Sequence, residues 1–260
     1  MTDWLSLCRA ARDDMDEVLT RLQGRAAREP VLGEGEGGDD TTAVDAAAEA
    51  AILPHFRRDD TRIVSEEAGL VGDGRYTVVI DPIDGSLNAK RGIRFFSLSI
   101  AVAEGATMDD VVFGYVYDFG SREEWTAERG RGAFLDGRPL VELPKDELEM
   151  VAFEATTVGD VARDADLLQG LVHRLRIMGS LALSLCHLAA GRLDAVVSPE
   201  PVRSVDIAAG ALLVRERGLA IDLPGDPPFG AAPLDLRRRS RIVAAGTDDL
   251  CGKLTRALGL

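Results

Sequence analysis

A strand-like run that ends in two aspartates is the feature that most constrains how this chain can fold. Residues 78–80 are Val-Val-Ile, typical of a buried strand, and the next six are Asp81-Pro82-Ile83-Asp84-Gly85-Ser86. Because proline fixes the backbone direction, both carboxylates and an intervening carbonyl, such as that of Ile83, can meet one hard cation. Backbone N–H groups at Gly85 and Ser86 are natural phosphate donors. The segment predicts a metal and an anion held side by side, with two successive surface turns as the alternative.

Three other acidic positions are candidates to join this segment. Glu66, the first of two successive glutamates, follows a predicted strand, so adjacent strands could bring it beside Asp81. Asp206 stands at the start of a predicted helix, and Asp45 lies at the start of an alanine-rich run. Taken singly, each has an ordinary explanation: a solvated pair for the glutamates and a helix cap for the aspartates. Their coincidence in one chain favours a shared site.

Taken in chain order, the acidic segments near residues 66, 81–86 and 206 resemble the signature of a known family, the inositol monophosphatase superfamily. The resemblance covers most of the chain and is closest to archaeal-type enzymes that accept both inositol monophosphate and fructose 1,6-bisphosphate. One departure is that Val205 and Ser86 stand where many members carry Trp and Thr. The residues that carry the resemblance are Glu66-Glu67, Asp81-Pro82-Ile83-Asp84-Gly85-Ser86 and Asp206-Ile207-Ala208-Ala209-Gly210.

The resemblance implies a layered α-β-α-β-α sandwich of the α+β / α/β class. It also implies a Mg²⁺-dependent phosphomonoesterase that hydrolyses small sugar or polyol phosphates with an activated water and two or three ions. Two alternatives stay open: a 3′(2′),5′-bisphosphate nucleotidase of the same superfamily, and a non-catalytic regulatory member. The implied metal ligands are Glu66, Asp81, the Ile83 carbonyl, Asp84 and Asp206. Asp45 and Ser86 would orient the water, and residues 84–86, including Gly85, would bind phosphate.

Residues on the substrate side are less clearly indicated. Arg176 precedes a helix start at Leu181 that could meet hydroxyls or a second phosphate, and Arg203 lies three residues before Asp206. A surface ion pair explains either arginine equally well. The acidic glycine loop 33–40 is either a linker or a lid that captures a further metal through Asp39 or Asp40.

The order of predicted elements divides the chain into two parts. Up to residue 148 we expect helices at 4–28 and 44–53 on an antiparallel or mixed sheet, with strands at 62–65, 76–80, 95–103 and 111–117 and short strands within 123–140. From 149 to 260 strands and helices alternate, as in an α/β layer. The sequence therefore predicts two domains, 1–148 and 149–260.

Composition restricts the partners and the location. Lys and Arg number 30 against 44 Asp and Glu, a formal net charge of −14 that opposes binding to nucleic acid or anionic membranes. Cys8, Cys186 and Cys251 are far apart and indicate neither a disulfide framework nor a zinc site. No signal peptide or membrane span is visible. We expect a cytoplasmic protein with a small-molecule phosphate substrate, and the resemblance favours a homodimer.

Competing motifs are weaker. Glycines 33, 35 and 38 match a dinucleotide fingerprint, but the acids among them would repel a pyrophosphate. An aspartyl-phosphate mechanism needs Asp-x-Asp-Gly, and the spacing here is one residue longer. The three histidines, at 55, 173 and 187, are expected to be packing or surface residues, and the basic run 237–241 is expected to be a solvated strand edge.

Overall fold

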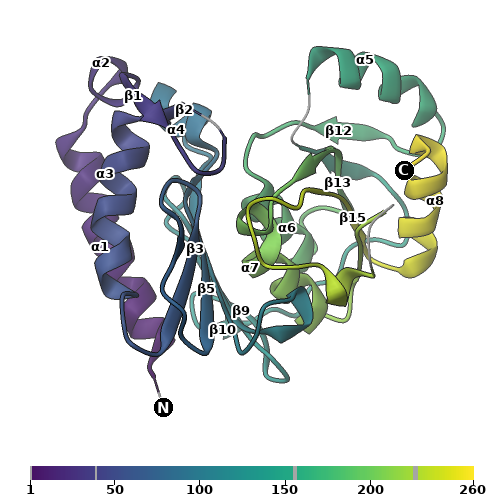
Figure 1. Ribbon diagram of the computed structural model, residues 1–260. Coiled ribbons are helices and arrows are strands. Elements are labelled where there is room, and N and C mark those ends of the chain that lie inside the picture. Colours follow the sequence, from purple (N-terminus) through teal and green to yellow (C-terminus); the bar gives the residue numbers. More distant parts are fainter. Residues whose placement is uncertain (1, 39, 155–156, 225–227) are drawn as a thin grey trace.

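Helices and two β-sheets alternate as five layers in the computed structural model, which describes residues 2–38, 40–154, 157–224 and 228–260 (Figure 1). One pair of helices covers the first sheet, a second pair separates the sheets, and a third pair covers the second sheet. The predicted α-β-α-β-α sandwich is confirmed. In layer order the helices are α1 (Trp4–Arg21) and α3 (Ala43–Ile52), α6 (Leu181–Ala189) and α7 (Ser204–Glu216), and α5 (Val158–Leu167) and α8 (Asp248–Leu258).

The first sheet has eight strands and is antiparallel except where β3 and β5 run parallel. It is mixed, as the strand pattern predicts, and all its strands lie between residues 61 and 139. In spatial order they are β10 (Arg138–Pro139), β9 (Gly132–Leu135), β8 (Glu124–Glu128), β7 (Val111–Asp118), β6 (Ser97–Ala103), β5 (Tyr76–Asp84), β3 (Thr61–Ser65) and β4 (Gly69–Val71).

The second sheet has five strands, with a parallel part formed by β12, β11 and β13 and an antiparallel part formed by β15 and β14. The alternation predicted after residue 149 omits β15 and α8. The predicted domain boundary falls between β10 and β11, but α7 from the second part packs against the first sheet, so the two-domain division stays a proposal. In spatial order the strands are β12 (Arg174–Arg176), β11 (Met150–Phe153), β13 (Ala195–Val202), β15 (Ser240–Ala245) and β14 (Ala220–Asp222).

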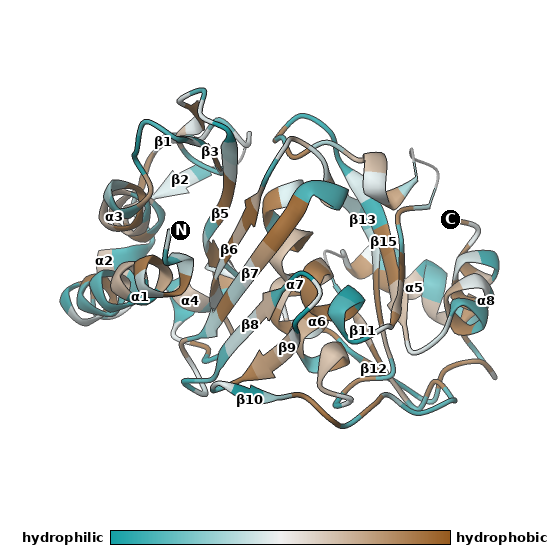
Figure 2. Ribbon diagram, turned by 90° about the horizontal axis from the view of Figure 1, so that it is seen from below, coloured by the Kyte–Doolittle hydropathy of each residue, from teal (hydrophilic) through white to brown (hydrophobic). Residues whose placement is uncertain are grey.

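Small residues let α7 lie close to both of its neighbours. A Cβ on Gly114 of β7 would stand 2.9 Å from the Ala209 carbonyl oxygen of α7, and one on Gly210 would stand 2.8 Å from the Leu185 Cβ of α6. Ten residues of α7 are buried, so the helix is covered on nearly every side, as Figure 2 shows for the hydrophobic middle layer. This close packing carries the start of α7 toward the end of β5.

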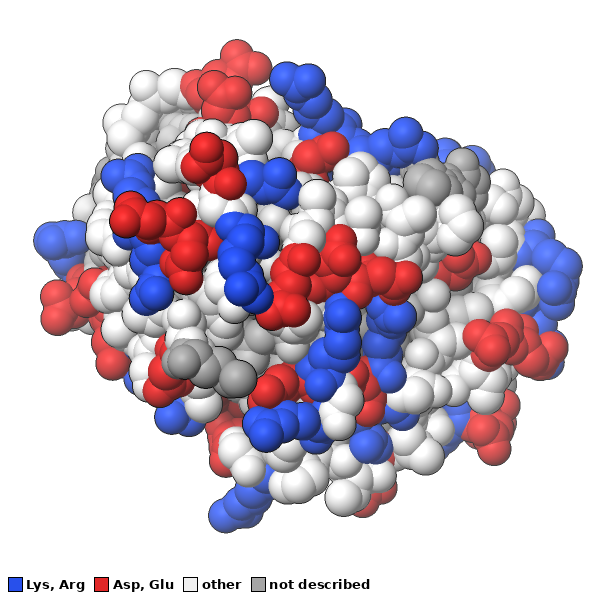
Figure 3. Space-filling model, turned by 60° about the horizontal axis from the view of Figure 1, so that its bottom comes forward, with Lys and Arg blue, Asp and Glu red and all other residues white. Residues whose placement is uncertain are grey.

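Charged side chains of both signs lie side by side on the face drawn in Figure 3. The net charge of −14 is therefore not gathered there into one acidic field. Among the described residues, no helix combines the length and apolarity that crossing a membrane requires.

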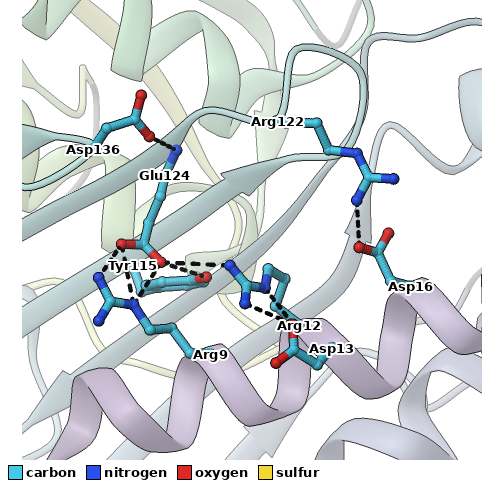
Figure 4. A network of polar contacts seen from close by, with 8 residues as sticks. All are labelled: Arg9, Arg12, Asp13, Asp16, Tyr115, Arg122, Glu124 and Asp136. Atoms are coloured by element: carbon cyan, nitrogen blue, oxygen red, sulfur yellow. Dashed lines mark hydrogen bonds and ion pairs between the residues drawn. The ribbon is translucent and has the colours of Figure 1, made fainter.

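A polar network fastens α1 to the first sheet (Figure 4). The Arg9 guanidinium donates two hydrogen bonds to the Glu124 carboxylate of β8, of 2.7 and 3.0 Å, and the buried Tyr115 hydroxyl donates to the same carboxylate at 3.3 Å. About two turns further along α1, Asp16 pairs with Arg122. A bidentate guanidinium pair fixes direction as well as distance, so the network sets how α1 crosses the sheet.

Two predicted segments differ from the structure. The first helix ends at Arg21 rather than at residue 28, because Gly24 takes a φ of +76°, and a separate turn, α2 (Arg25–Arg28), follows. The segment expected to be a loop contains two antiparallel strands, β1 (Val31–Glu34) and β2 (Asp40–Thr42). The glycine motif therefore lies within a hairpin and opens no helix after a buried strand, which excludes the dinucleotide fingerprint.

Replacing Gly114 by alanine tests the close approach of α7. The added methyl group would push on backbone rather than on a flexible side chain, so Gly114→Ala should lower the free energy of unfolding by about 1–3 kcal/mol in urea denaturation. The control is Gly33→Ala, where a Cβ has nothing within 4 Å and φ is not positive. An unchanged or raised stability of Gly114→Ala would show that α7 has room to spare.

Candidate active site

A β-bulge at the end of β5 turns two aspartates to one side. Side chains alternate along a strand, so residues three apart normally face opposite sides of a sheet. Asp81 pairs with Ser99 of β6 and Asp84 with Ser97, so three steps on β5 match two on β6. The extra residue cancels the alternation, and Asp81 and Asp84 line the same cavity.

This cavity has a volume of about 340 Å³ and collects acids from separate elements. Glu66 follows β3, the two aspartates end β5, and Asp206 belongs to the first turn of α7. Asp45 of α3 and Ser86 at the start of α4 (Ser86–Arg91) line the same cavity. The lining residues are Asp40, Asp45, Glu66, Glu67, Asp81, Ile83, Asp84, Gly85, Ser86, Lys90, Arg203 and Asp206.

The start of α6 holds the Asp84 carboxylate. The Ser180 hydroxyl donates to Asp84 Oδ2, the Ala182 N–H donates to the same oxygen at 2.8 Å, and the Leu181 N–H donates to Oδ1 at 3.2 Å. A helix start offers N–H groups without intrahelical acceptors, and its dipole favours a negative charge. This is the helix start that could, from the sequence, meet substrate hydroxyls or a second phosphate, and in the structure its donors bond to Asp84.

Arg203 lies between two acids that come from different elements. Its guanidinium is 2.8 Å from Glu66 Oε1 and 3.2 Å from Asp206 Oδ1, and only 8% of the residue is exposed. Asp206 is the third residue of α7 rather than its cap, and its Oδ2 accepts the Arg203 N–H at 2.6 Å. Arg203 is thus an internal counter-ion of the acidic cavity rather than a surface ion pair.

Lys90 is a cavity residue that sequence reasoning missed. Its ammonium group lies 3.1 Å from Asp45 Oδ2 and 3.5 Å from the Ser86 hydroxyl, so it joins the two residues expected to orient water. One signal was available. Lys90 is one of three lysines in the chain, and it follows Ser86 by four residues, which places both on one face of a helix.

Burial makes three acids of the cavity hard to ionise. It raises the pKa of Glu66 to about 7, with repulsion from Asp206 and Glu67 adding to the effect and the Arg203 guanidinium opposing it. It also raises the pKa of Asp84 to about 7, against the hydrogen bond from Ser180. The pKa of Asp81 rises well above its usual range through burial and the nearby carboxylates. A divalent cation would relieve this repulsion.

The donor set fits Mg²⁺. Four carboxylates and the Ile83 carbonyl offer the hard oxygen ligands that this ion prefers. Among the described residues, no three Asp, Glu, His or Cys side chains are arranged to ligate a common ion. The Arg203 guanidinium lies between Glu66 and Asp206 and contacts both carboxylates.

Two predicted substrate residues lie outside the cavity lining. Arg176 is half-buried on the edge strand β12, where its guanidinium donates to the Leu175 carbonyl at 3.0 Å. The Leu181 side chain is buried and its N–H is bonded to Asp84. In the hairpin, Asp40 lines the cavity, whereas Asp39 lies outside the described residues.

Comparison with known proteins identifies the family and the fold. Residues 5–258 match the sequence pattern described as the inositol monophosphatase family. The chain belongs to the inositol monophosphatase family. A fructose-1,6-bisphosphatase/inositol-1-monophosphatase of Methanothermobacter thermautotrophicus is 31% identical over 271 residues, covering 98% of this chain and 96% of that protein. The resemblance stated from the acidic segments is confirmed.

Other members of the inositol monophosphatase family differ in what their names state. A crystal structure named as an inositol monophosphatase-fructose 1,6-bisphosphatase superposes with a TM-score of 0.87 at 29% identity, covering 98% of this chain and all of that one. The Nus factor SuhB of Pseudomonas aeruginosa is 35% identical over 214 residues, covering 76% of this chain and 78% of that protein. The relatives of this chain thus include proteins named for phosphatases and proteins named Nus factor SuhB.

The raised pKa values predict how stability depends on pH and Mg²⁺. Glu66 and Asp84 have folded-state pKa values of about 7, above their unfolded values near 4. Their contribution to stability is complete below about pH 4 and is lost as pH rises through 7. Without divalent ions the melting temperature should fall by roughly 5 °C or more between pH 5 and 8. Added Mg²⁺ should raise it more at pH 8 than at pH 5, because protons no longer compete.

Differential scanning calorimetry measures the melting temperature at both pH values, once in EDTA and once in ~10 mM Mg²⁺ without EDTA. Glu66→Gln, which cannot ionise, is the control and should flatten part of the pH dependence. Equal stabilisation by Mg²⁺ at both pH values would contradict the assignment of the carboxylates to the ion.

Proposed function

We propose that this protein is a Mg²⁺-dependent phosphomonoesterase that hydrolyses small sugar or polyol phosphates, such as inositol 1-phosphate and fructose 1,6-bisphosphate. The observation that carries the proposal is the cavity in which Glu66, Asp81, Asp84 and Asp206 lie beside the start of α4. Family membership supports the same reaction class. Glu66, Asp81, the Ile83 carbonyl, Asp84 and Asp206 would hold two or three ions.

Each wall of the cavity would serve one part of the reaction. Bound Mg²⁺ supplies Lewis-acid activation of water and neutralises charge on the phosphate. The N–H groups at Gly85 and Ser86 stand at the start of α4, where they would donate to a phosphate. Asp45 accepts hydrogen bonds from Thr42 and lies against Lys90, so its carboxylate is held in place to orient a water together with Ser86. The water would attack in line, and no side chain need form a covalent intermediate.

Gly85 is required where it stands. Its φ is +90°, and a Cβ there would lie 2.8 Å from the Gly179 carbonyl oxygen. An alanine would strain the backbone and push apart the end of β5 and the start of α6. This supports the assignment of residues 84–86 to phosphate binding, because the turn must stay open and close to α6.

A regulatory role is the second candidate, favoured by relatives that are named Nus factor SuhB. The basic run 237–241 is its support in the sequence. Two of its arginines donate to carbonyls of this chain, Arg239 to Gly37 at 2.8 Å and Arg241 to Pro199 at 2.7 Å. These two arginines therefore bind the β1–β2 hairpin and β13 of the chain itself. Because they are engaged within the fold, we give the enzyme proposal precedence.

Location and assembly remain predictions. The three cysteines are buried free thiols, in keeping with a reducing cytoplasm. A homodimer is proposed from the family alone, and small-molecule phosphates are the proposed partners.

A phosphate-release assay separates the candidate functions. Inositol 1-phosphate and fructose 1,6-bisphosphate should be hydrolysed in Mg²⁺ and not in EDTA, while adenosine 3′,5′-bisphosphate should be a poorer substrate. A preference for the nucleotide would indicate the nucleotidase alternative. Absence of hydrolysis from all three, with Mg²⁺ bound, would favour the regulatory role.

Asp206→Asn tests the metal ligand that comes from the second half of the chain. Removing the charge should lower kcat/KM roughly a hundredfold or more. Its matched control is Asp160→Asn, because Asp160 holds the same third helix position and accepts the Thr157 N–H at 2.8 Å, but lies outside the cavity lining. Both variants should lose at most about 1 kcal/mol of stability. Equal activity of the two would remove Asp206 from the site.

A further inference from the structure

Glu154 is a buried carboxylate that the proposed reaction does not use. It follows β11 and only 1% of it is exposed, yet three donors point at it. Its Oε2 accepts the Gly179 N–H at 2.8 Å, and its Oε1 accepts the Met178 N–H at 3.1 Å and the Ser184 hydroxyl at 2.8 Å. A carboxylate so far from water is costly to keep unless those bonds are made. The hydrogen bonds between Glu154 and the turn at 178–179 therefore fix the position of the turn and offset the cost of burying the carboxylate.

The turn at 178–179 leads directly into the residues that bind Asp84. Residues 180–182 follow it in the chain and donate three hydrogen bonds to the Asp84 carboxylate. The Asn88 side chain of α4 donates to the Met178 carbonyl at 2.7 Å, and the Gly179 carbonyl lies against Gly85. The turn is thus fastened to Glu154 from the second sheet and to the metal-facing segment from the first.

The geometry assigns Glu154 as a positioning residue. Through residues 178–182, which are the turn and the start of α6, it sets the direction of the Asp84 carboxylate. The assignment rests on the proposed function, since it takes Asp84 to be a ligand of Mg²⁺. Both Asp84 oxygens receive hydrogen bonds from this turn, so a displacement of the turn moves the oxygens offered to the ion. Partners that orient a metal ligand in this way commonly affect metal affinity 10–100-fold, an order-of-magnitude expectation.

Asp194 provides a matched comparison. It is also buried, with 5% exposed, and its two oxygens accept the N–H groups of Lys145 and Met150 at 3.0 and 2.8 Å. Asp194 lies before β13 and beside the start of the parallel strand β11, whereas Glu154 follows the end of β11. The two carboxylates make similar bonds at opposite ends of these strands, and only the bonds of Glu154 lead to Asp84.

Replacing either carboxylate by an amide turns an NH₂ donor toward a backbone N–H donor. In Glu154→Gln one orientation turns the NH₂ group toward the Gly179 N–H, and the other turns it toward the Met178 N–H. In Asp194→Asn the NH₂ group likewise faces Lys145 or Met150. Both variants should therefore lose stability, and a purely structural role would leave Mg²⁺ affinity unchanged in both.

The test is calorimetric titration of Mg²⁺ into the full-length, EDTA-treated and desalted protein without substrate, paired with urea unfolding of each variant. We expect Glu154→Gln to weaken Mg²⁺ binding about tenfold or more, and Asp194→Asn to bind like wild type. Wild-type affinity in a folded Glu154→Gln would overturn the assignment. Absence of Mg²⁺ binding to the wild type would instead contradict the proposed function.

Ser184→Ala keeps the assignment testable if Glu154→Gln does not fold. It removes one of the three donors to Glu154 and leaves both backbone bonds, so it should fold and should weaken Mg²⁺ binding by a smaller factor in the same direction. An unchanged affinity in Ser184→Ala, measured beside an unfolded Glu154→Gln, would also overturn the assignment.

Discussion

Repulsion among buried carboxylates that share one cavity is the constraint on which the rest of the structure depends. Glu66, Asp81, Asp84 and Asp206 oppose one another, and burial removes the water that would screen them. The chain offsets part of this cost with its own groups, the Arg203 guanidinium and the donors at the start of α6. Both are provided by the second half of the chain, which also provides Asp206. The packing that brings the acids together therefore also brings the groups that offset their repulsion.

The middle layer of helices makes that assembly possible. Because α7 carries small residues against β7 and α6, its first turn comes near the end of β5, where the bulge has turned two aspartates to one side. The residues that determine packing, such as Gly114 and Gly210, are distant from the chemistry. Their effect on the site is nevertheless direct, since a shift of α7 carries Asp206 with it.

Most of the fold and the acidic part of the site could be predicted from the sequence, because strand ends, helix periodicity and the Asp-Pro-Ile-Asp-Gly-Ser segment are local patterns. The bulge could not, since it is a relation between β5 and β6. The roles of Lys90 and of the α6 start also depend on which charges surround them in space. Strand β15 overlaps the basic run 237–241 that was expected to be a strand edge, but its apolar part up to Ala245 was not predicted. Arg176, for which a substrate contact and a surface ion pair were both open, lies on the edge strand β12 and outside the cavity lining, because proximity along the chain to a helix start does not fix where an edge-strand side chain lies.

The source of the bonds to Asp84 has a consequence for biosynthesis. The strand that bears this aspartate ends at residue 84, whereas its three hydrogen-bond donors begin at residue 180 and the opposing Asp206 comes later still. A ribosome that has released only the first sheet has therefore produced a nascent chain whose acidic pocket lacks one wall. If the acids bind Mg²⁺ as proposed, cation binding waits until nearly the whole polypeptide has been translated, and it stabilises the finished native state rather than starting its formation.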